Sequence, residues 1–442
     1  MTERVYQELL TRVGEQNPRP RLEPTRRLVN LLGNPERSAP VIHLTGTNGK
    51  TSTARVIDSL VRASGLRTGL LTSPHLERFA ERILIDGEPI DDDALERNWD
   101  DIEPFVHIVD EELTAAGELP LTFFEVLTAL AFAAFADAPV DVIILEVGMG
   151  GEWDSTNVAD ATVAVFTPID LDHLGRIGNS LEEIAHTKAG IIKPGSFVVS
   201  AAQPAAVERI LRERAEQVGA TFRLLPNDAE VTDLHLAVGG QLLSIRGLAR
   251  AFQDLFLPLF GAHQAENAAL ALVAVEAFLG GGSVPLADEL VIQGFAGASS
   301  PGRLELIGSQ PAVLVDGAHN PHGMRSLVRA VKTSFNFDEL VVVVGVLADK
   351  DVDGVLQELA ELHSPVIVTE SRSERALPTA ELRTRAEAAG LTVSSIPDAE
   401  IALESAREWA RGAPGRGVLV TGSLTLVGLA RGIASTQGWS VV

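Results

Sequence analysis

The segment Gly46-Thr47-Asn48-Gly49-Lys50-Thr51-Ser52 lies between an apolar run at 40–44 and a segment with helical periodicity at 51–64. A strand, a glycine loop with a lysine, and a helix in this order form a phosphate-binding site. Loop amides and the positive end of the helix hold phosphate oxygens there, and the lysine reaches the terminal phosphates. The hydroxyl of Thr51 or Ser52 can ligate Mg²⁺. We therefore expect a nucleoside triphosphate as the ligand.

This loop departs from the commonest phosphate-loop pattern. Leu44 stands where the pattern GxxxxGK[ST] has its first glycine, which weakens an interpretation as a generic kinase or motor. The alternative at this position is a plain glycine turn before a helix. The strand, the lysine and the hydroxyls together favour the phosphate site.

Lysine is rare in this chain. The sequence has 36 lysines and arginines, but lysine occurs only at positions 50, 188, 193, 332 and 350. Because arginine supplies most of the cations, the few lysines are enriched for sites that need a compact, titratable ammonium group. Lys50 and Lys188 are the candidates for chemistry, whereas Lys332 reads as a solvated cation near the end of a helix.

Composition excludes several classes of function. The net charge of −24 argues against a nucleic-acid partner and against an anionic membrane surface, because both require a basic face. The absence of cysteine excludes disulfides, zinc–thiolate sites and a thiol nucleophile. The first ten residues have no apolar signal core, and no apolar run reaches ~18 residues. We expect a soluble, cytoplasmic protein.

The pattern of strands and helices predicts two α/β domains. In the first, 1–297, apolar strands at 41–45, 66–72, 140–147, 162–167 and 196–201 alternate with helical patterns, which is typical of a mostly parallel sheet covered on both faces. A hairpin within 221–260 and a helix at 263–279 follow. From 298 to 442 the alternation restarts, which predicts a smaller, Rossmann-like domain. The glycine-rich stretch 294–302 reads as the linker.

Polar residues stand where predicted strands end. Glu146 follows the apolar strand 140–145, and its carboxylate would ligate Mg²⁺ directly or through water. The alternative is an acid that caps the strand toward solvent. His173 follows the next strand with Asp172, and a neutral imidazole there could complete a metal site. An isolated Asp-His pair is more often a turn or a core histidine.

Lys188 lies about two turns into a helix that begins with the capping box Ser180-Leu-Glu-Glu183. A partly desolvated lysine has a lowered pKa and can capture CO₂ as a carbamate, which converts the cation into an anionic metal ligand. The alternative is a surface lysine that extends its ammonium to solvent.

The assembled motifs resemble one family over nearly the whole chain: the folylpolyglutamate synthases and dihydrofolate synthases of the Mur ligase superfamily. The motifs are His43-Leu-Thr-Gly-Thr-Asn-Gly-Lys-Thr-Ser52, Thr72-Ser-Pro-His-Leu76, Leu121-Thr-Phe-Phe-Glu125, Glu146-Val-Gly-Met-Gly-Gly151, Asp154-Ser-Thr-Asn157, Lys188-Ala-Gly-Ile-Ile-Lys193, Pro301-Gly-Arg-Leu-Glu305 and Asp316-Gly-Ala-His-Asn-Pro321. Their order and number make the resemblance specific.

The resemblance implies roles for individual residues. It implies that Ser73, Glu146 and His173 arrange Mg²⁺, with Lys188 as the carbamylated lysine. It implies that four residues contact ATP or close the second domain over it: Asn267, Arg303, Asp316 and His319. A pterin-bearing substrate would lie near Phe124, Asp154 and Ser155. Glu152 stands where the family commonly has arginine and Ser155 where alanine is usual, and both positions bear on the folate side.

The expected chemistry is ATP-driven amide formation between a folate or dihydropteroate carboxylate and L-glutamate, through an acyl phosphate. ATP and Mg²⁺ are the expected cofactors, a monovalent cation is a further candidate, and a monomer is expected. Only 45 residues precede Gly46, which argues against a separate UDP-sugar domain. Two alternatives remain. A P-loop NTPase or small-molecule kinase would turn over ATP without glutamate, and a non-catalytic nucleotide-binding module would bind ATP without hydrolysis.

Overall fold

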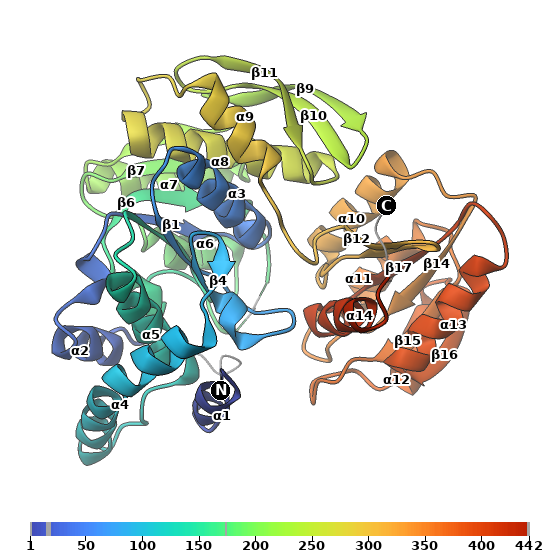
Figure 1. The fold of residues 1–442 in the computed structure, drawn as a ribbon, viewed down its shortest axis with the longest axis horizontal. Coiled ribbons are helices and arrows are strands. Elements are labelled where there is room, and N and C mark those ends of the chain that lie inside the picture. The colour runs from blue at the N-terminus through green and yellow to red at the C-terminus, as the bar shows by residue number, and fades with distance from the viewer. Residues whose placement is uncertain (1, 15–18, 173–174, 440–442) are drawn as a thin grey trace. The chain divides into compact units, whose positions relative to one another are not determined.

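In the computed structural model, residues 2–14, 19–172 and 175–439 are described. The chain divides into two compact units. The first comprises 1–237, 242–258 and 265–299, and the second comprises 238–241, 259–264 and 300–442. Figure 1 labels their elements. The boundary at 297/298 expected from the sequence stays a prediction.

An eight-stranded sheet forms the centre of the first unit, in the order β4-β3-β2-β5-β1-β6-β7-β8. Its strands are β1 Val41–Thr45, β2 Thr68–Leu71, β3 Ile83–Ile85, β4 Glu88–Pro89, β5 Val142–Glu146, β6 Ala161–Phe166, β7 Phe197–Ser200 and β8 Thr221–Leu224. The strands β2, β5, β1, β6, β7 and β8 run parallel to one another. Strands β3 and β4 add an antiparallel edge. Strand β1 is central, and β5 and β6 are its neighbours.

Helices cover both faces of this sheet. The helices of this part of the chain, some of which pack on other helices, are α1 Thr2–Leu10, α2 Glu23–Leu31, α3 Lys50–Ala63, α4 Asp92–Ala115, α5 Phe123–Asp137, α6 Leu181–Ala189, α7 Ala205–Gln217, α8 Ala262–Gly280 and α9 Asp288–Ala296. Helix α5 packs closely on β2, where a Cβ at Gly69 would lie 2.4 Å from Phe135. Ile143 and Leu145 join the core on the α5 side, and their neighbours in β5 are equally buried. Two buried faces explain why the central strands are apolar without alternation.

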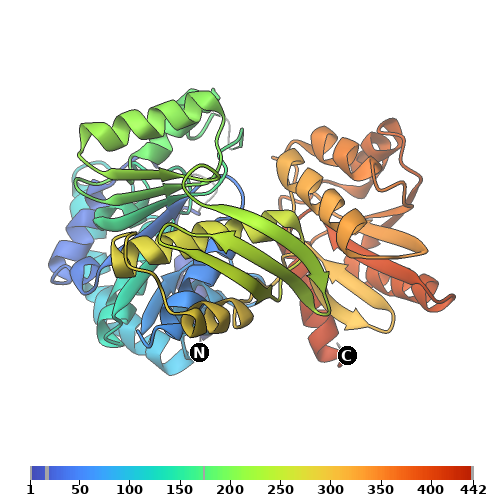
Figure 2. The same ribbon diagram turned by 90° about the horizontal axis from the view of Figure 1, so that it is seen from above.

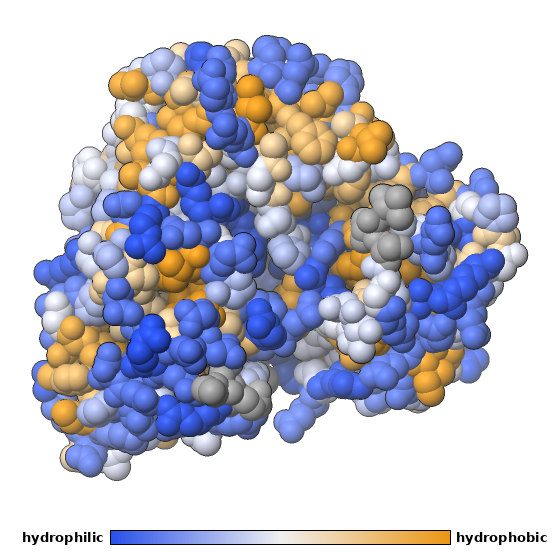
Figure 3. Space-filling model, viewed as in Figure 1, coloured by the Kyte–Doolittle hydropathy of each residue, from blue (hydrophilic) through white to orange (hydrophobic). Residues whose placement is uncertain are grey.

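A second, three-stranded sheet has the order β11-β10-β9, with β9 Glu230–Ala237, β10 Gly240–Arg246 and β11 Ala251–Leu257. Strand β11 packs with α9, and Figure 2 shows these yellow-green strands beside the yellow helices. Exposed apolar side chains occur here, among them Val238, which is 99% exposed at the β9–β10 turn. Figure 3 shows apolar residues gathered over this region, whereas much of the same face is hydrophilic.

The second unit has a six-stranded sheet in the order β12-β13-β17-β14-β15-β16. Its strands are β12 Glu305–Ser309, β13 Ala312–Val315, β14 Glu339–Val344, β15 Val366–Glu370, β16 Val393–Asp398 and β17 Arg416–Thr421. Its helices are α10 Pro321–Ser334, α11 Val352–Ala360, α12 Thr379–Ala388, α13 Ala399–Arg411 and α14 Leu424–Thr436. Strand β12 is antiparallel and the others are parallel. The predicted α/β class with a smaller Rossmann-like second domain is confirmed.

Among the residues described in the two units, no helix combines the length and apolar character needed to cross a membrane.

Candidate active site

The predicted phosphate loop connects the central strand β1 to the first turn of α3. Gly49 is the N-cap of α3 with φ +87°, and Gly46 has φ +151°. A Cβ at Gly46 would lie 1.9 Å from Thr167 Oγ1, and a Cβ at Gly49 would lie 2.6 Å from Asn267 Oδ1. Both positions therefore require glycine, for conformation and for space. The close approach also places Asn267, from the start of α8, directly over the loop.

Side chains at the loop fix its shape. Thr47 Oγ1 donates to the carbonyl oxygen of Asp170 at 2.9 Å and accepts from the Asp170 amide at 3.0 Å. The Nζ atom of Lys50 donates to the carbonyl oxygens of Gly46 and Thr47, at 3.2 Å each. The Lys50 ammonium thus lies over the loop at the N-terminal end of α3, where it adds to the positive end of the helix dipole. This arrangement suits a polyphosphate.

A buried carboxylate stands beside the loop. Glu146, the last residue of β5, is 2% exposed, and β5 pairs directly with β1. Its carboxylate accepts from Thr51 Oγ1 at 2.9 and 3.0 Å and from Thr72 Oγ1. Ser73 follows Thr72 and is partly buried. A buried carboxylate ringed by hydroxyl groups offers hard oxygen donors, which fits Mg²⁺.

Lys188 lies almost fully buried in α6, with 4% of its surface exposed. Its Nζ atom donates to the carbonyl oxygen of Gly46 at 2.9 Å, the same oxygen that Lys50 contacts. Burial, reinforced by the positive charge of Lys50, lowers the pKa of the Lys188 ammonium to about 7, against the opposing effect of Asp172. A large fraction of this amine is therefore neutral near pH 7.

The start of α6, the helix that contains Lys188, differs in detail from the expected capping box. Ser180 is the N-cap and accepts from the Glu183 amide at 3.2 Å, as predicted. The Glu183 carboxylate, however, accepts from the Asn179 amide at 2.7 Å. The Glu183 carboxylate thus binds the backbone N–H of the residue before the N-cap. This hydrogen bond holds the preceding chain against the helix.

The loop 148–157 follows β5, includes most of the 3₁₀ helix η3, Ser155–Val158, and lies against α6. The Glu152 amide donates to the Thr187 carbonyl oxygen at 2.8 Å, and a Cβ at Gly151 would lie 2.9 Å from the Lys188 carbonyl oxygen. Phe124, at the start of α5, lies over Gly148, where a Cβ would be 2.6 Å from its ring. Phe124 and the backbone of Lys188 therefore both contact the loop 148–157.

Asp154 and Ser155 are buried within this loop, at 7% and 5% exposure. The Asp154 carboxylate accepts from the Met149 amide at 2.9 Å, from the Thr156 amide at 3.0 Å and from Thr156 Oγ1 at 2.5 Å. Burial raises the pKa of the Asp154 carboxyl above its usual value, against these hydrogen bonds. Here Asp154 organises its own loop, and its contact with a substrate stays a prediction.

In the second unit, the predicted residues cluster at the carboxyl end of β13. Asp316 is buried and accepts from the amides of Leu304 and Ala318, at 2.8 Å each. Burial raises the pKa of its carboxyl, and the Arg303 guanidinium opposes this shift. Arg303 lies over Gly317, where a Cβ would be 2.6 Å from its Nη1 atom. His319 is held by the Gly317 carbonyl oxygen, 2.8 Å from its Nδ1 atom.

Two matches to family models cover most of both units. The Mur ligase middle domain matches residues 94–275, and the glutamate ligase domain of Mur ligases matches residues 302–424. The chain is 44% identical over 432 residues to the dihydrofolate synthase/folylpolyglutamate synthase of Mycobacterium tuberculosis, covering 91% of this chain and 88% of that protein. The chain belongs to the folylpolyglutamate synthase and dihydrofolate synthase family. The resemblance deduced from the sequence is confirmed.

Other members of this family are also similar to this chain in sequence and in structure. The folylpolyglutamate synthase of Lacticaseibacillus casei is 38% identical over 355 residues, covering 80% of this chain and 82% of that protein. A crystal structure of the M. tuberculosis folylpolyglutamate synthase complexed with ADP and AMPPCP has a TM-score of 0.92 at 42% identity. It covers 98% of this chain and 97% of the M. tuberculosis chain.

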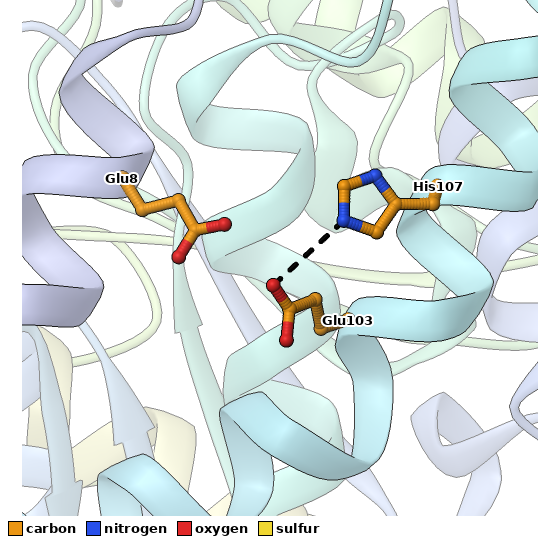
Figure 4. A group of neighbouring side chains, drawn as sticks. All are labelled: Glu8, Glu103 and His107. Atoms are coloured by element: carbon orange, nitrogen blue, oxygen red, sulfur yellow. Dashed lines mark ion pairs between the residues drawn. The ribbon is translucent and has the colours of Figure 1, made fainter.

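One predicted metal ligand and one other group of metal-ligand type are not part of the site described around Glu146. His173 lies outside the described residues. Within the part of the chain that the structure does describe, one group of metal-ligand type is Glu8, Glu103 and His107, shown in Figure 4. It lies between α1 and α4 on the surface of this family member, with His107 Nε2 3.7 Å from Glu103. It shares no residue with the site around Glu146.

Sequence reasoning missed several polar residues of the site. Thr72 lies in a quoted motif but was given no role, and His43, Thr45 and Thr156 were not considered separately. His43 Nε2 lies 2.8 Å from Thr156 Oγ1, and Thr45 Oγ1 donates to the Gly150 carbonyl oxygen at 2.7 Å. For His43 and Thr45, the available signal was a polar residue inside an otherwise apolar strand, because such groups need buried partners.

Proposed function

We propose that this chain is an ATP-dependent ligase that joins L-glutamate to a folate carboxylate through an acyl phosphate. The observation that carries the proposal is the convergence of the phosphate loop, the buried carboxylate of Glu146 and the near-neutral amine of Lys188. Family membership supports the substrate class. The relatives named above are folylpolyglutamate synthases, and one of them is also a dihydrofolate synthase.

The first half-reaction forms the acyl phosphate. An oxygen of the folate carboxylate attacks the γ-phosphorus of ATP, the bond to the β,γ-bridging oxygen breaks, and ADP leaves. Loop amides and the Lys50 ammonium orient the phosphates and stabilise the charge that develops on them. For this, Lys50 exchanges its loop carbonyl partners for phosphate oxygens.

The second half-reaction forms the amide. The amine of glutamate attacks the acyl carbon, phosphate leaves, and the amine loses a proton. No side-chain nucleophile is required. Residues Arg303, Asp316 and His319 are proposed to contact ATP, and exclusion of water would protect the acyl phosphate from hydrolysis. Asn267 is proposed to contact the nucleotide from above Gly49.

Mg²⁺ is the proposed metal cofactor, held by Glu146, Thr51 and Ser73, with His173 and a carbamylated Lys188 as further ligands. When bound, it would neutralise phosphate charge. The carbamate forms when the neutral Lys188 amine attacks CO₂ and loses one proton. Support for this comes from the pKa of about 7, because an amine with the ordinary value of 10.5 would stay protonated. A monovalent cation remains a further candidate.

The folate is proposed to lie against the loop 148–157 and Phe124. This loop lies between β1 and Lys188. The carboxylate of a folate bound there would therefore reach the end of the phosphate loop. Glu152 and Ser155, which depart from the family pattern, would alter the contacts on this side. We further propose that the enzyme acts as a cytoplasmic monomer.

A coupled ADP-release assay tests the proposal, with tetrahydrofolate, methylenetetrahydrofolate or dihydropteroate, each with and without L-glutamate. We expect glutamate-dependent ADP release with at least one tetrahydrofolate form. Turnover with dihydropteroate would add dihydrofolate synthase activity. Glutamate-independent turnover would instead indicate a kinase or NTPase, and ATP binding without turnover under all conditions would indicate a non-catalytic module.

A further inference from the structure

Strand β1 contains a histidine that the ligation chemistry does not use. His43 lies in the centre of Val41–Thr45, is 0% exposed, and has Ile42 and Leu44 as neighbours. Burial, together with the charge of Lys193, lowers the pKa of His43 to about 3, so the imidazole is neutral. A neutral imidazole has one N–H donor, and the tautomer depends on its partners.

The contacts of Thr156 determine that tautomer. Its hydroxyl has a single proton and donates it to Asp154 Oδ1 at 2.5 Å. The 2.8 Å contact between His43 Nε2 and Thr156 Oγ1 therefore requires Nε2–H to donate. His43 Nδ1 is then an acceptor, and this atom has no hydrogen-bond partner among the residues that the structure describes. A directed chain results, from His43 Nε2–H to Thr156 Oγ1–H and on to Asp154.

Asp154 extends the chain into the loop 148–157. Its Oδ2 atom accepts from the Met149 amide at 2.9 Å, so one carboxylate joins the beginning and the end of the loop. Thr45, two residues after His43 and therefore on the same face of β1, donates to the Gly150 carbonyl oxygen. Two residues of one strand thus hold this loop, and the same strand continues into the phosphate loop at Gly46.

The geometry points to His43 as a positioning residue that, through Thr156 and Asp154, fixes the loop 148–157 for the acceptor substrate. This inference rests on the proposed function in one respect, the identification of that loop as the acceptor side. It assigns His43 no contact with any substrate. Its effect should therefore appear in acceptor recognition and in the order of the loop, and not in nucleotide binding.

Two matched pairs of variants test the role of this chain of hydrogen bonds. His43→Leu removes the donor, while His43→Gln retains an N–H at the end of a side chain of similar reach. Thr156→Val removes the hydroxyl, while Thr156→Ser retains it. Thr25→Val is the control, because Thr25 is also fully buried in the first unit but its hydroxyl has no hydrogen-bond partner within the described part of the chain.

We expect His43→Leu to raise the KM for the folate substrate about tenfold. The reason is that the buried hydroxyl oxygen of Thr156 loses the N–H group that donates a hydrogen bond to it. The KM for ATP should stay within about twofold, and His43→Gln should recover the acceptor KM to within about threefold. Thr156→Val should have at least the effect of His43→Leu, and Thr156→Ser should resemble the parent enzyme. Equal increases in both KM values would overturn the inference, because they indicate a general structural effect.

Hydrogen–deuterium exchange of the full chain supplies a measurement that needs no folate substrate. Exchange in peptides covering 148–157 should rise in His43→Leu and Thr156→Val and remain unchanged in Thr25→Val. If His43→Leu does not fold, the Thr156 pair gives the same test. Absence of folate turnover in the parent enzyme, with the exchange pattern as expected, would refute the proposed function only. Unchanged exchange and acceptor KM in an active enzyme would refute the role of His43.

Discussion

The pH dependence of ligation is a direct test of carbamylation at Lys188. Only a neutral amine attacks CO₂, and with a pKa of about 7 about one tenth of Lys188 is neutral at pH 6 and about nine tenths at pH 8. A lysine with the ordinary pKa of 10.5 would be neutral in roughly three molecules per thousand at pH 8. At a fixed, low concentration of dissolved CO₂, at which only a small fraction of Lys188 is carbamylated, we expect the carbamate to increase at least about tenfold between pH 6 and 8, because the proton released on its formation adds to the trend.

Two measurements follow this change. Carbon-13 NMR with labelled CO₂ should show a carbamate signal that grows with pH and is absent in Lys188→Ala. The ligation rate, measured by ADP release at saturating substrates, should increase in parallel. A short-chain carboxylic acid should restore part of the Lys188→Ala activity by replacing the missing anion.

The matched control is Lys188→Arg, which keeps the positive charge but forms no carbamate under these conditions. It should lose activity and gain nothing from added carboxylic acid. Normal kinetics in this variant would refute the reasoning. A ligation rate without pH dependence between 6 and 8, together with no carbamate signal, would do the same.

Three further substitutions test other parts of the site. Lys50→Ala should lower the ligation rate by about 10²–10³ without changing the circular dichroism spectrum, because Lys50 acts on transition-state charge, and near-normal turnover would contradict its role. Gly49→Ala should weaken nucleotide binding by at least about tenfold in calorimetry, since φ +87° costs about 1–2 kcal/mol and the new Cβ meets Asn267. Gly65→Ala, with φ +85° but open space, is its control and should leave nucleotide affinity unchanged. Asp316→Ala should lower ligation on the order of 10²-fold by misplacing its segment while ATP binding persists, and an unchanged ADP-release rate would count against this.

The local signals around the phosphate loop were sufficient to predict this part of the fold. The apolar run 40–44, two glycines and an amphipathic segment specify β1, the loop and α3, because each local preference agrees with the others. Glu146 could also be placed, since a charged residue directly after an apolar strand lies at the carboxyl edge of a parallel sheet.

Other features depend on contacts that local sequence does not encode. Helix α4, Asp92–Ala115, was not predicted, and it contains Pro104 within its length. Packing through residues such as Trp99 stabilises it against α5. The burial of Lys188 also could not be deduced, because a lysine with apolar neighbours on a helix is equally consistent with an exposed ammonium. The β1–loop connection through His43 joins residues 113 positions apart.

The Lys50 ammonium over the phosphate loop has a consequence for binding kinetics. The whole chain carries a net charge of −24, and ATP, folate and glutamate are all anions. At long range the protein therefore repels its proposed substrates, and attraction begins near the Lys50 ammonium and the amides of the phosphate loop. The Debye length is about 10 Å at 0.1 M salt and about 30 Å at 0.01 M, so added salt screens the distant repulsion more than the local contacts. Nucleotide association should consequently become faster as ionic strength increases over this range, the reverse of the usual behaviour of electrostatically steered binding.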